Sequence, residues 1–290
     1  MHQQNSSPNG AWLRISAASC SDVGRVREHN EDAIALCELP DLTLLAQLGR
    51  LYLLADGAGG HAAGEVASQV AVETITAAYY DQTTSSNSVE NVPQSQGVAK
   101  HLHSPLGDLG TPIMQIQRAF FAAHTRIREL AAHKREYSGM LTTCLAAVVK
   151  GAQVLIAHVG DSRAYLLHAS SESLPTITCL TTDHSMVTEL ARAGIISPEQ
   201  MQSSPSRHII LRALGGRKEG NPAPDVTTCL VQAGDLLVLC CDGLWSKLTE
   251  EQIAAVMSRN TPPLAGAELI RLANEAGGED NISVIVLSFT

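Results

Sequence analysis

The sequence predicts an α+β fold in which antiparallel sheets are layered with helices, and three observations support it. Strand and helix patterns occur in blocks, without the regular strand–helix alternation of parallel sheets. In residues 141–180, consecutive strand patterns are joined by tight turns at Lys150-Gly151 and Gly160-Asp161, and connections this short join antiparallel neighbours. Residues 63–80 repeat apolar side chains at helical spacing, which is typical of a helix packed on a sheet.

The first half of the chain predicts strands around a charged loop, followed by two long helices. The expected strands cover residues 12–20, 33–39 and 48–55, and the expected helices cover residues 63–80 and 112–135. Pro112 suits the first turn of the second helix, and the basic run 133–135 suits its end. Residues 81–111 are rich in Ser, Thr, Asn, Gln and Pro, which predicts a polar insertion rather than a folded element.

The second half predicts a block of strands interrupted by short helices. The expected strands cover residues 141–149, 153–159, 164–168, 176–180, 226–231, 235–241 and 282–289, and the expected helices cover residues 185–193, 198–201, 249–258 and 263–276. Residues 185–224 combine two short helices with a stretch rich in Pro and Gly, which indicates a mobile flap. We expect residues 1–11 to be a flexible tail and residues 12–290 to form a single domain.

Composition argues against several classes of protein. The chain has 20 Lys and Arg against 29 Asp and Glu, a net charge of −9, which disfavours nucleic acid or an anionic membrane as the main partner. No apolar stretch approaches the roughly 20 residues that span a bilayer, and residues 1–10 lack the apolar region of a signal peptide. We therefore expect a cytoplasmic protein without membrane insertion. The 7 cysteines form no C-x-x-C pair, so zinc is not favoured.

The first candidate site lies between Leu51 and Glu65. An apolar run ends at Asp56, glycines follow, and a helical pattern begins. A carboxylate at a strand end, beside backbone freed by Gly57, can direct a side-chain oxygen and a main-chain carbonyl at one cation. Two alternatives remain open from this stretch alone. Asp-Gly is a common hairpin turn, and residues 57–62 fit the G-x-G-x-x-G/A dinucleotide fingerprint, although a pyrophosphate there would face the Asp56 carboxylate.

Other carboxylates stand in similar positions, each beside a predicted strand. In chain order they are Glu31, Asp32, Asp161, Asp242 and Asp280. If these strand ends lie at one rim of a pair of sheets, their negative charges together with that of Asp56 require cations. Oxygen ligands without paired Cys or His select hard ions, and the sequence therefore predicts Mg²⁺ or Mn²⁺.

Six motifs occur in a fixed order over nearly the whole chain. They are Arg27-x-x-x-Glu31-Asp32, Asp56-Gly57 with the following Gly-Gly-His-x-x-Gly-Glu, Gly160-Asp161-Ser162-Arg163, Thr182-Asp183-His184-Ser185, Asp242-Gly243 and Glu279-Asp280-Asn281. Each motif alone is weak, whereas the ordered set is highly specific. The chain resembles the metal-dependent protein phosphatases of the PP2C (PPM) family, in their bacterial form. The resemblance implies a four-layer αββα sandwich, with two central antiparallel sheets flanked by helices.

The resemblance also implies two core metal ions and assigns roles to individual residues. Asp56 would bridge both ions, Asp242 and Asp280 would hold the first, and Glu31 and the Gly57 carbonyl would hold the second. Asp32 would support the ligands through water, and Asp161 would bind a third, weaker ion. Arg27 would bind the phosphate, and Asn281 would orient the ligands without binding an ion itself. A water or hydroxide that bridges the two ions would then attack phosphorus, so that no cysteine or serine nucleophile is required.

The implied function is that of a serine/threonine phosphoprotein phosphatase that uses Mn²⁺ or Mg²⁺. Its expected partners are phosphoserine and phosphothreonine proteins, with a cognate Hanks-type kinase and its substrates. The alternative is a pseudophosphatase or partner-binding regulatory module on the same fold, which would need lost metal ligands, and none is lost. Ala58 stands where animal enzymes of the family have a His that acts as general acid. We do not transfer that role to His61, and we expect His184 to serve the structure of the flap.

Overall fold

The computed structural model describes residues 13–58, 63–81, 109–168, 176–216 and 222–290. Its first part contains β1 (Ile15–Asp22), β2 (Asp32–Cys37), α1 (Leu42–Leu48), β3 (Arg50–Ala58), α2 (Ala63–Tyr80), α3 (Gly110–His133) and a 3-10 turn (Arg135–Tyr137). The second part contains β4 (Leu141–Thr142), β5 (Cys144–Lys150), β6 (Gln153–Val159), β7 (Arg163–His168), β8 (Thr176–Cys179), α4 (Met186–Arg192), α5 (Pro198–Ser203), β9 (Leu214–Gly215), β10 (Asp225–Leu230), β11 (Leu236–Cys240), α6 (Asp242–Trp245), α7 (Glu250–Met257), α8 (Pro262–Glu275) and β12 (Ile282–Phe289). The expected tail at 1–11, most of the expected insertion at 81–111, and His61 lie outside the described residues.

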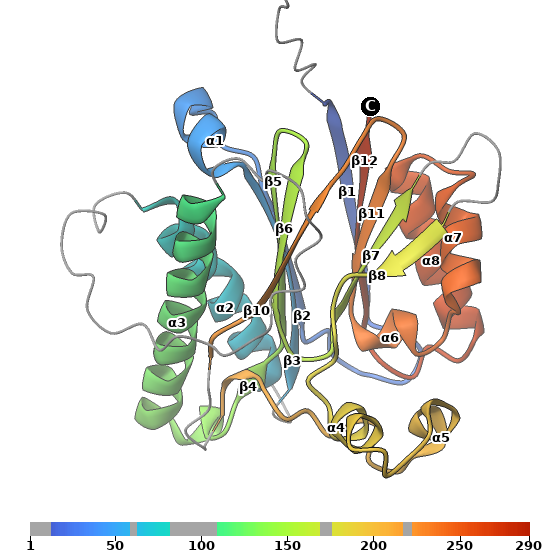
Figure 1. The fold of residues 1–290 in the computed structure, drawn as a ribbon. Coiled ribbons are helices and arrows are strands. Elements are labelled where there is room, and N and C mark those ends of the chain that lie inside the picture. Colours follow the sequence, from blue (N-terminus) through green and yellow to red (C-terminus); the bar gives the residue numbers. More distant parts are fainter. Residues whose placement is uncertain (1–12, 59–62, 82–108, 169–175, 217–221) are drawn as a thin grey trace, which may run out of the picture.

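Two sheets stand face to face in the middle of the described part of the chain (Figure 1). One has five strands in the order β1-β12-β11-β7-β8, and the other has seven, in the order β10-β6-β5-β3-β4-β9 with β2 paired to β3. The strand pairs are antiparallel, as the short connections predict. Helices α2 and α3 cover the outer face of the seven-stranded sheet, and α7 and α8 cover the outer face of the five-stranded sheet (Figure 1).

Three buried apolar clusters fill the spaces between these four layers. They follow from the alternation of side chains along each strand. In β3, Leu51 and Leu53 pack toward the helices α2 and α3, whereas Tyr52 and Leu54 pack between the two sheets. The structure confirms the expected four-layer sandwich. Because alternate residues of a strand face opposite sides, every second residue of β3 points into the space between the sheets.

Three local features differ from the sequence prediction. Helices α1 and α6 are too short to show a helical repeat, and α3 begins at Gly110, two residues before the predicted start. The third difference concerns β3, which was expected to end at Asp56. Its ladder with β5 ends at the pair Leu54 and Leu145, and β3 then pairs with β4 through Gly57 and Thr142. Asp56 therefore lies where β3 changes its partner, inside the strand rather than at its end.

The segment at 185–224 is attached to the sandwich at its two ends. Ser185 and Ile210 form an isolated antiparallel bridge, so α4 and α5 lie within a loop closed at its base. Residues Leu214–Gly215 then join β4 as strand β9. The part of this segment nearest the sheet is thus tied to the same β4 that pairs with β3 beyond Asp56.

Candidate metal centre

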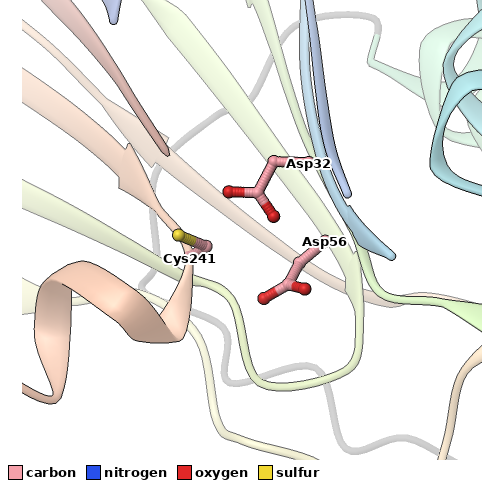
Figure 2. A group of neighbouring side chains, drawn as sticks. All are labelled: Asp32, Asp56 and Cys241. Atoms are coloured by element: carbon pink, nitrogen blue, oxygen red, sulfur yellow. The ribbon is translucent and has the colours of Figure 1, made fainter. Parts of the chain in front are cut away.

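Two carboxylates enter the space between the sheets from neighbouring strands. Asp56 has the same parity in β3 as Tyr52 and Leu54, which pack between the sheets. Asp32 begins β2 and is the register partner of Asp56. Figure 2 shows the two carboxylates side by side, both directed toward the end of the opposite sheet. Strand pairing alone therefore places two acids where an apolar core would otherwise continue.

Some carboxylate oxygens of the centre lack the partners that buried carboxylates normally have. Both carboxylate oxygens of Asp32, and Oδ1 of Asp161, are buried without a protein hydrogen bond of normal geometry. Leaving such atoms unpaired costs free energy unless a further group satisfies them. A cation would supply that partner, and the donor set consists of hard oxygen ligands. The residues present therefore fit Mg²⁺ or Mn²⁺.

The pKa values of the acids reflect the same crowding. Burial, followed by the fields of neighbouring carboxylates, raises the pKa of Asp32 to about 7 and that of Asp161 to about 8. Burial and Asp280 raise the pKa of Asp242 to about 6. Burial raises the pKa of Asp56 well above its usual range, and Asp32, Asp242, Asp161 and Asp280 raise it further. The structure thus brings together five acids that the sequence spreads from residue 32 to residue 280.

Cys241 is the third side chain of this group, at the end of β11 (Figure 2). The ligand atoms of Asp32, Asp56 and Cys241 lie within 4.8 Å of one another. The Cys241 thiol donates to the Asn281 carbonyl at 3.3 Å, and its sulfur accepts from the Ser283 amide at 3.1 Å. Burial and the nearby carboxylates raise the pKa of this thiol. Cys241 therefore joins the end of β11 to the start of β12 as a neutral thiol, a role the sequence did not indicate.

Asn281 fixes the loop that carries Glu31. Its Oδ1 accepts from the Glu31 amide at 2.8 Å, and its Nδ2 donates to the carbonyls of Val23 and His29 at 2.9 Å each. All the polar atoms of this buried side chain are thus used to hold one loop. Burial raises the pKa of Glu31, and Arg27 opposes that shift. Asn281 places Glu31 beside the other acids without itself needing to contact an ion.

Two glycines are required by close approach rather than by unusual backbone angles. A Cβ atom at Gly57 would lie 2.2 Å from the Gly64 carbonyl oxygen and 2.6 Å from that of Glu31. A Cβ atom at Gly243 would lie 2.0 Å from the Asn281 carbonyl oxygen. Each of these glycines directly follows an acid of the centre, so the backbone is packed most tightly beside Asp56 and Asp242.

Arg27 lies at the rim of the centre. Its Nη2 donates to Asp280 Oδ2 at 2.8 Å, and the two side chains are 49% and 35% exposed. An exposed guanidinium beside a cluster of acids can turn to a phosphate, because its fork of donors matches two phosphate oxygens.

The turn that carries Asp161 is held by Trp245, which the motifs did not reveal, and Trp245 in turn packs on the motif residue Arg163. Trp245 Nε1, in α6 just beyond Asp242, donates to the Asp161 carbonyl at 2.9 Å. The Arg163 guanidinium lies 3.7 Å from the centre of the Trp245 ring and makes two hydrogen bonds to Asp183, at 2.7 and 3.0 Å. The positions of Asp161 and Asp242 are therefore linked through Trp245.

This centre can be compared with known proteins. Residues 24–274 match the family profile described as protein phosphatase 2C. The chain belongs to the protein phosphatase 2C family. It is accordingly a metal-dependent serine/threonine protein phosphatase, a phosphoric monoester hydrolase of the PPM type. The sequence-based identification of the family and of its α+β sandwich is thereby confirmed.

Curated relatives and solved structures agree with this family assignment. The serine/threonine phosphatase Stp of Listeria innocua is 34% identical over 268 residues, which cover 92% of this chain and 93% of the relative. The crystal structure of the Mycobacterium tuberculosis phosphatase PstP has a TM-score of 0.73 at 31% identity and covers 95% of this chain and 98% of that one. A PstP catalytic domain in complex with two manganese ions has a TM-score of 0.72 at 31% identity, covering 96% and 99%.

In the described part of this protein phosphatase 2C chain, no helix combines the length and the apolar character that a bilayer span needs.

Proposed function

We propose that this chain removes phosphate from phosphoserine and phosphothreonine in proteins, with two Mn²⁺ or Mg²⁺ ions held between its two sheets and a third, weaker ion beside them. The observation that supports this most is the group of buried acids with unpartnered oxygens, Asp32 and Asp161 among them. The chemistry that two such ions supply when bound is activation of a water for in-line attack and neutralisation of phosphate charge.

The ligand roles are those that the resemblance to the family implies, and the arrangement of the acids supports them. Four neighbouring acids raise the pKa of Asp56, which is proposed as the ligand shared by both core ions. Asp242 and Asp280, which flank strands of the five-stranded sheet, would hold one ion, while Glu31 and the Gly57 carbonyl would hold the other. Asp32 would support these ligands through water, and Asp161 would bind the third ion.

The cysteines of the chain do not offer a nucleophile at this centre. Burial raises the pKa of all 7 cysteines, which keeps them as unreactive thiols. Arg27 is proposed to bind the non-bridging phosphate oxygens, where it stabilises the charge of the transition state. Asn281 keeps Glu31 in place while the substrate enters.

The partner kinase, the cellular location and the domain boundaries are part of the same proposal. A Hanks-type kinase that phosphorylates the same proteins would be the natural counterpart of this phosphatase, and both would act in the cytoplasm. Residues 12–290 would form one phosphatase domain, with 81–111 as an insertion and 185–224 as a flap near the substrate.

The test is turnover of a phosphothreonine peptide and of p-nitrophenyl phosphate by the purified full chain with Mn²⁺, with Mg²⁺ and with EDTA. We expect turnover with either ion and at least a hundredfold loss in EDTA that added Mn²⁺ restores, because about 3 kcal/mol or more of transition-state stabilisation depends on the ions. Folded protein that binds Mn²⁺ without turnover would instead support the pseudophosphatase alternative.

Arg27→Ala is expected to raise KM for the phosphopeptide about tenfold and to change kcat much less, because it removes the group proposed to bind phosphate. The substitution also releases Asp280 Oδ2, so KM and kcat should be measured at saturating Mn²⁺. Arg27→Lys is the matched control, since it keeps the positive charge but loses the forked donors of the guanidinium. Its KM should lie between those of wild type and Arg27→Ala. An unchanged KM for Arg27→Ala would show that Arg27 does not bind the phosphate.

A further inference from the structure

The backbone of Gly160, the residue before Asp161, is held from both sides by His184. The Gly160 amide donates to His184 Nδ1 at 3.0 Å, and the His184 amide donates to the Gly160 carbonyl at 2.9 Å. Gly160 has a φ of 113°, which a residue with a side chain rarely adopts. His184 is only 8% exposed. It therefore holds an unusual turn in place and does not face the substrate.

The hydrogen bond from Gly160 fixes which nitrogen of the His184 ring carries the proton. Because a backbone amide only donates, Nδ1 must be the unprotonated nitrogen, and the proton belongs on Nε2. His184 Nε2 lies 3.2 Å from Asp225 Oδ2, which can accept that proton's hydrogen bond. Arg212 Nη1 lies 2.7 Å from Asp225 Oδ1 and equally close to His184 Nε2. A guanidinium also only donates, so Arg212 and the Gly160 amide compete for the one unprotonated ring nitrogen. Asp225 decides between them, because its carboxylate accepts from a protonated Nε2 and from Arg212 at the same time, which leaves Nδ1 to accept from Gly160.

The surroundings hold this arrangement in place. His158 stacks on His184 with the ring centres 4.7 Å apart and the planes at 4°, and His158 Nε2 bonds to the Thr182 carbonyl at 2.9 Å. Burial lowers the pKa of His158 to about 4, so its neutral ring does not repel His184. Arg212 Nη2 also donates to the Ala223 carbonyl. His184 is thus supported by His158 of β6, by Asp225 at the start of β10 and by Arg212.

We propose that His184 is a positioning residue for this phosphatase: its Nδ1 and its amide hold the Gly160 peptide so that the Asp161 carboxylate faces the metal centre, and Asp225, oriented by Arg212, keeps the ring in the tautomer that this requires. The proposal rests on the proposed function insofar as Asp161 is a metal ligand. It links His184, through two hydrogen bonds of known direction, to the turn that carries the proposed ligand Asp161.

Two substitutions of His184 separate its two ring nitrogens. In His184→Asn the side-chain oxygen can occupy the place of Nδ1 and still accept from Gly160, whereas in His184→Gln the amide reaches the place of Nε2 and leaves Gly160 without that partner. Both variants lose the ring stacked on His158, so packing is matched. We expect hydrogen exchange of the Gly160 amide in the metal-free protein to be about tenfold faster in His184→Gln than in His184→Asn, the effect of one lost hydrogen bond.

The wild-type protein and Asp225→Asn give a second readout. In wild type, ¹⁵N spectra are expected to show the His184 proton on Nε2. In Asp225→Asn the amide oxygen would keep Arg212, so the amide NH₂ would face Nε2 and drive the proton to Nδ1, where it displaces the Gly160 amide. A wild-type proton on Nδ1, or equal Gly160 exchange in His184→Asn and His184→Gln, would overturn the proposal.

Mn²⁺ titration of the same proteins distinguishes this proposal from the metal assignment. We expect His184→Gln to weaken the third Mn²⁺ about tenfold and to leave the two core ions unchanged, with His184→Asn close to wild type. If Asp161→Ala binds as many Mn²⁺ ions as wild type, the metal role of Asp161 is wrong, and the exchange and tautomer measurements still decide whether His184 positions the turn.

Discussion

Asp56→Asn is expected to abolish metal-dependent phosphatase activity and, at the same time, to stabilise the metal-free protein. The amide is nearly the same size as the carboxylate but removes the charge of the ligand proposed to be shared by both ions, so turnover should fall by about a thousandfold or more. A simple folding defect would lower activity and stability together. The opposite signs make the prediction specific to a centre built from crowded acids.

The stabilisation depends on pH, and its sign follows from the raised pKa values. Acids whose pKa is higher in the folded protein than in the unfolded chain contribute stability that is present below about pH 4 and is lost as the pH rises through the folded values. Those values are about 6, 7 and 8 for Asp242, Asp32 and Asp161. Without metal, the free energy of unfolding of the wild-type protein should therefore fall between about pH 5 and pH 8.

The measurement is denaturant unfolding in EDTA at about pH 5 and pH 8, the two sides of these shifts. At the higher pH, Asp56→Asn should unfold with a free energy at least about 1.4 kcal/mol above wild type, the equivalent of one pKa unit. Asp235→Asn is the control, because Asp235 is fully buried but accepts hydrogen bonds from the Gln232 amide and pairs with His168. That control should destabilise the protein. If Asp56→Asn destabilises the metal-free protein as Asp235→Asn does, the acids of the centre do not repel one another.

Gly243→Ala is expected to damage the centre without changing any ligand. The new Cβ atom would lie 2.0 Å from the Asn281 carbonyl oxygen and 3.5 Å from the Asp280 Cβ atom. Because the nearest atom belongs to the backbone at the start of β12, α6 and β12 must move apart. We expect a loss of stability of about 1–3 kcal/mol and at least about tenfold weaker binding of the core ions, since their ligands must be held in place closely.

Gly110→Ala is the matched control for this substitution. A Cβ atom at Gly110, the first residue of α3, would meet no atom within 4 Å, so stability and Mn²⁺ affinity should stay close to wild type. Unfolding curves and Mn²⁺ titrations measure both quantities. Core ions bound as tightly by Gly243→Ala as by wild type would show that the contact between α6 and β12 does not position Asp242 and Asp280.

The sequence predicted the layers of the fold because each depends on a local repeat. The short apolar runs of β5 and β6 and the helical spacing in α2 are visible in the sequence itself, and so are the acids beside the strands. The change of partner by β3 at Asp56 was not predictable in the same way. It depends on Thr142 and Thr143, whose hydrogen bonds to Asp56 bridge more than 80 positions in the chain.

The groups that hold the acids were also hidden in the sequence. Cys241 looks like an ordinary core residue in an apolar run, and nothing in the motifs singles out Trp245. Their roles come from hydrogen bonds with backbone atoms, of Asn281 and Ser283 for Cys241 and of Asp161 for Trp245. Such bonds leave no periodic pattern, because they depend on how distant loops meet after the sheets have packed.

The position of β12 has a consequence for how the enzyme is made. This strand lies between β1 and β11 in the five-stranded sheet, and its register with β1 joins Ile15 to Phe289. During synthesis, the first strand must therefore wait for residues 282–289 before it can pair as it does here. Asp280 arrives with the same segment. A chain that still lacks residues 280–289 therefore lacks both the strand that pairs with β1 and one of the acids gathered at the centre.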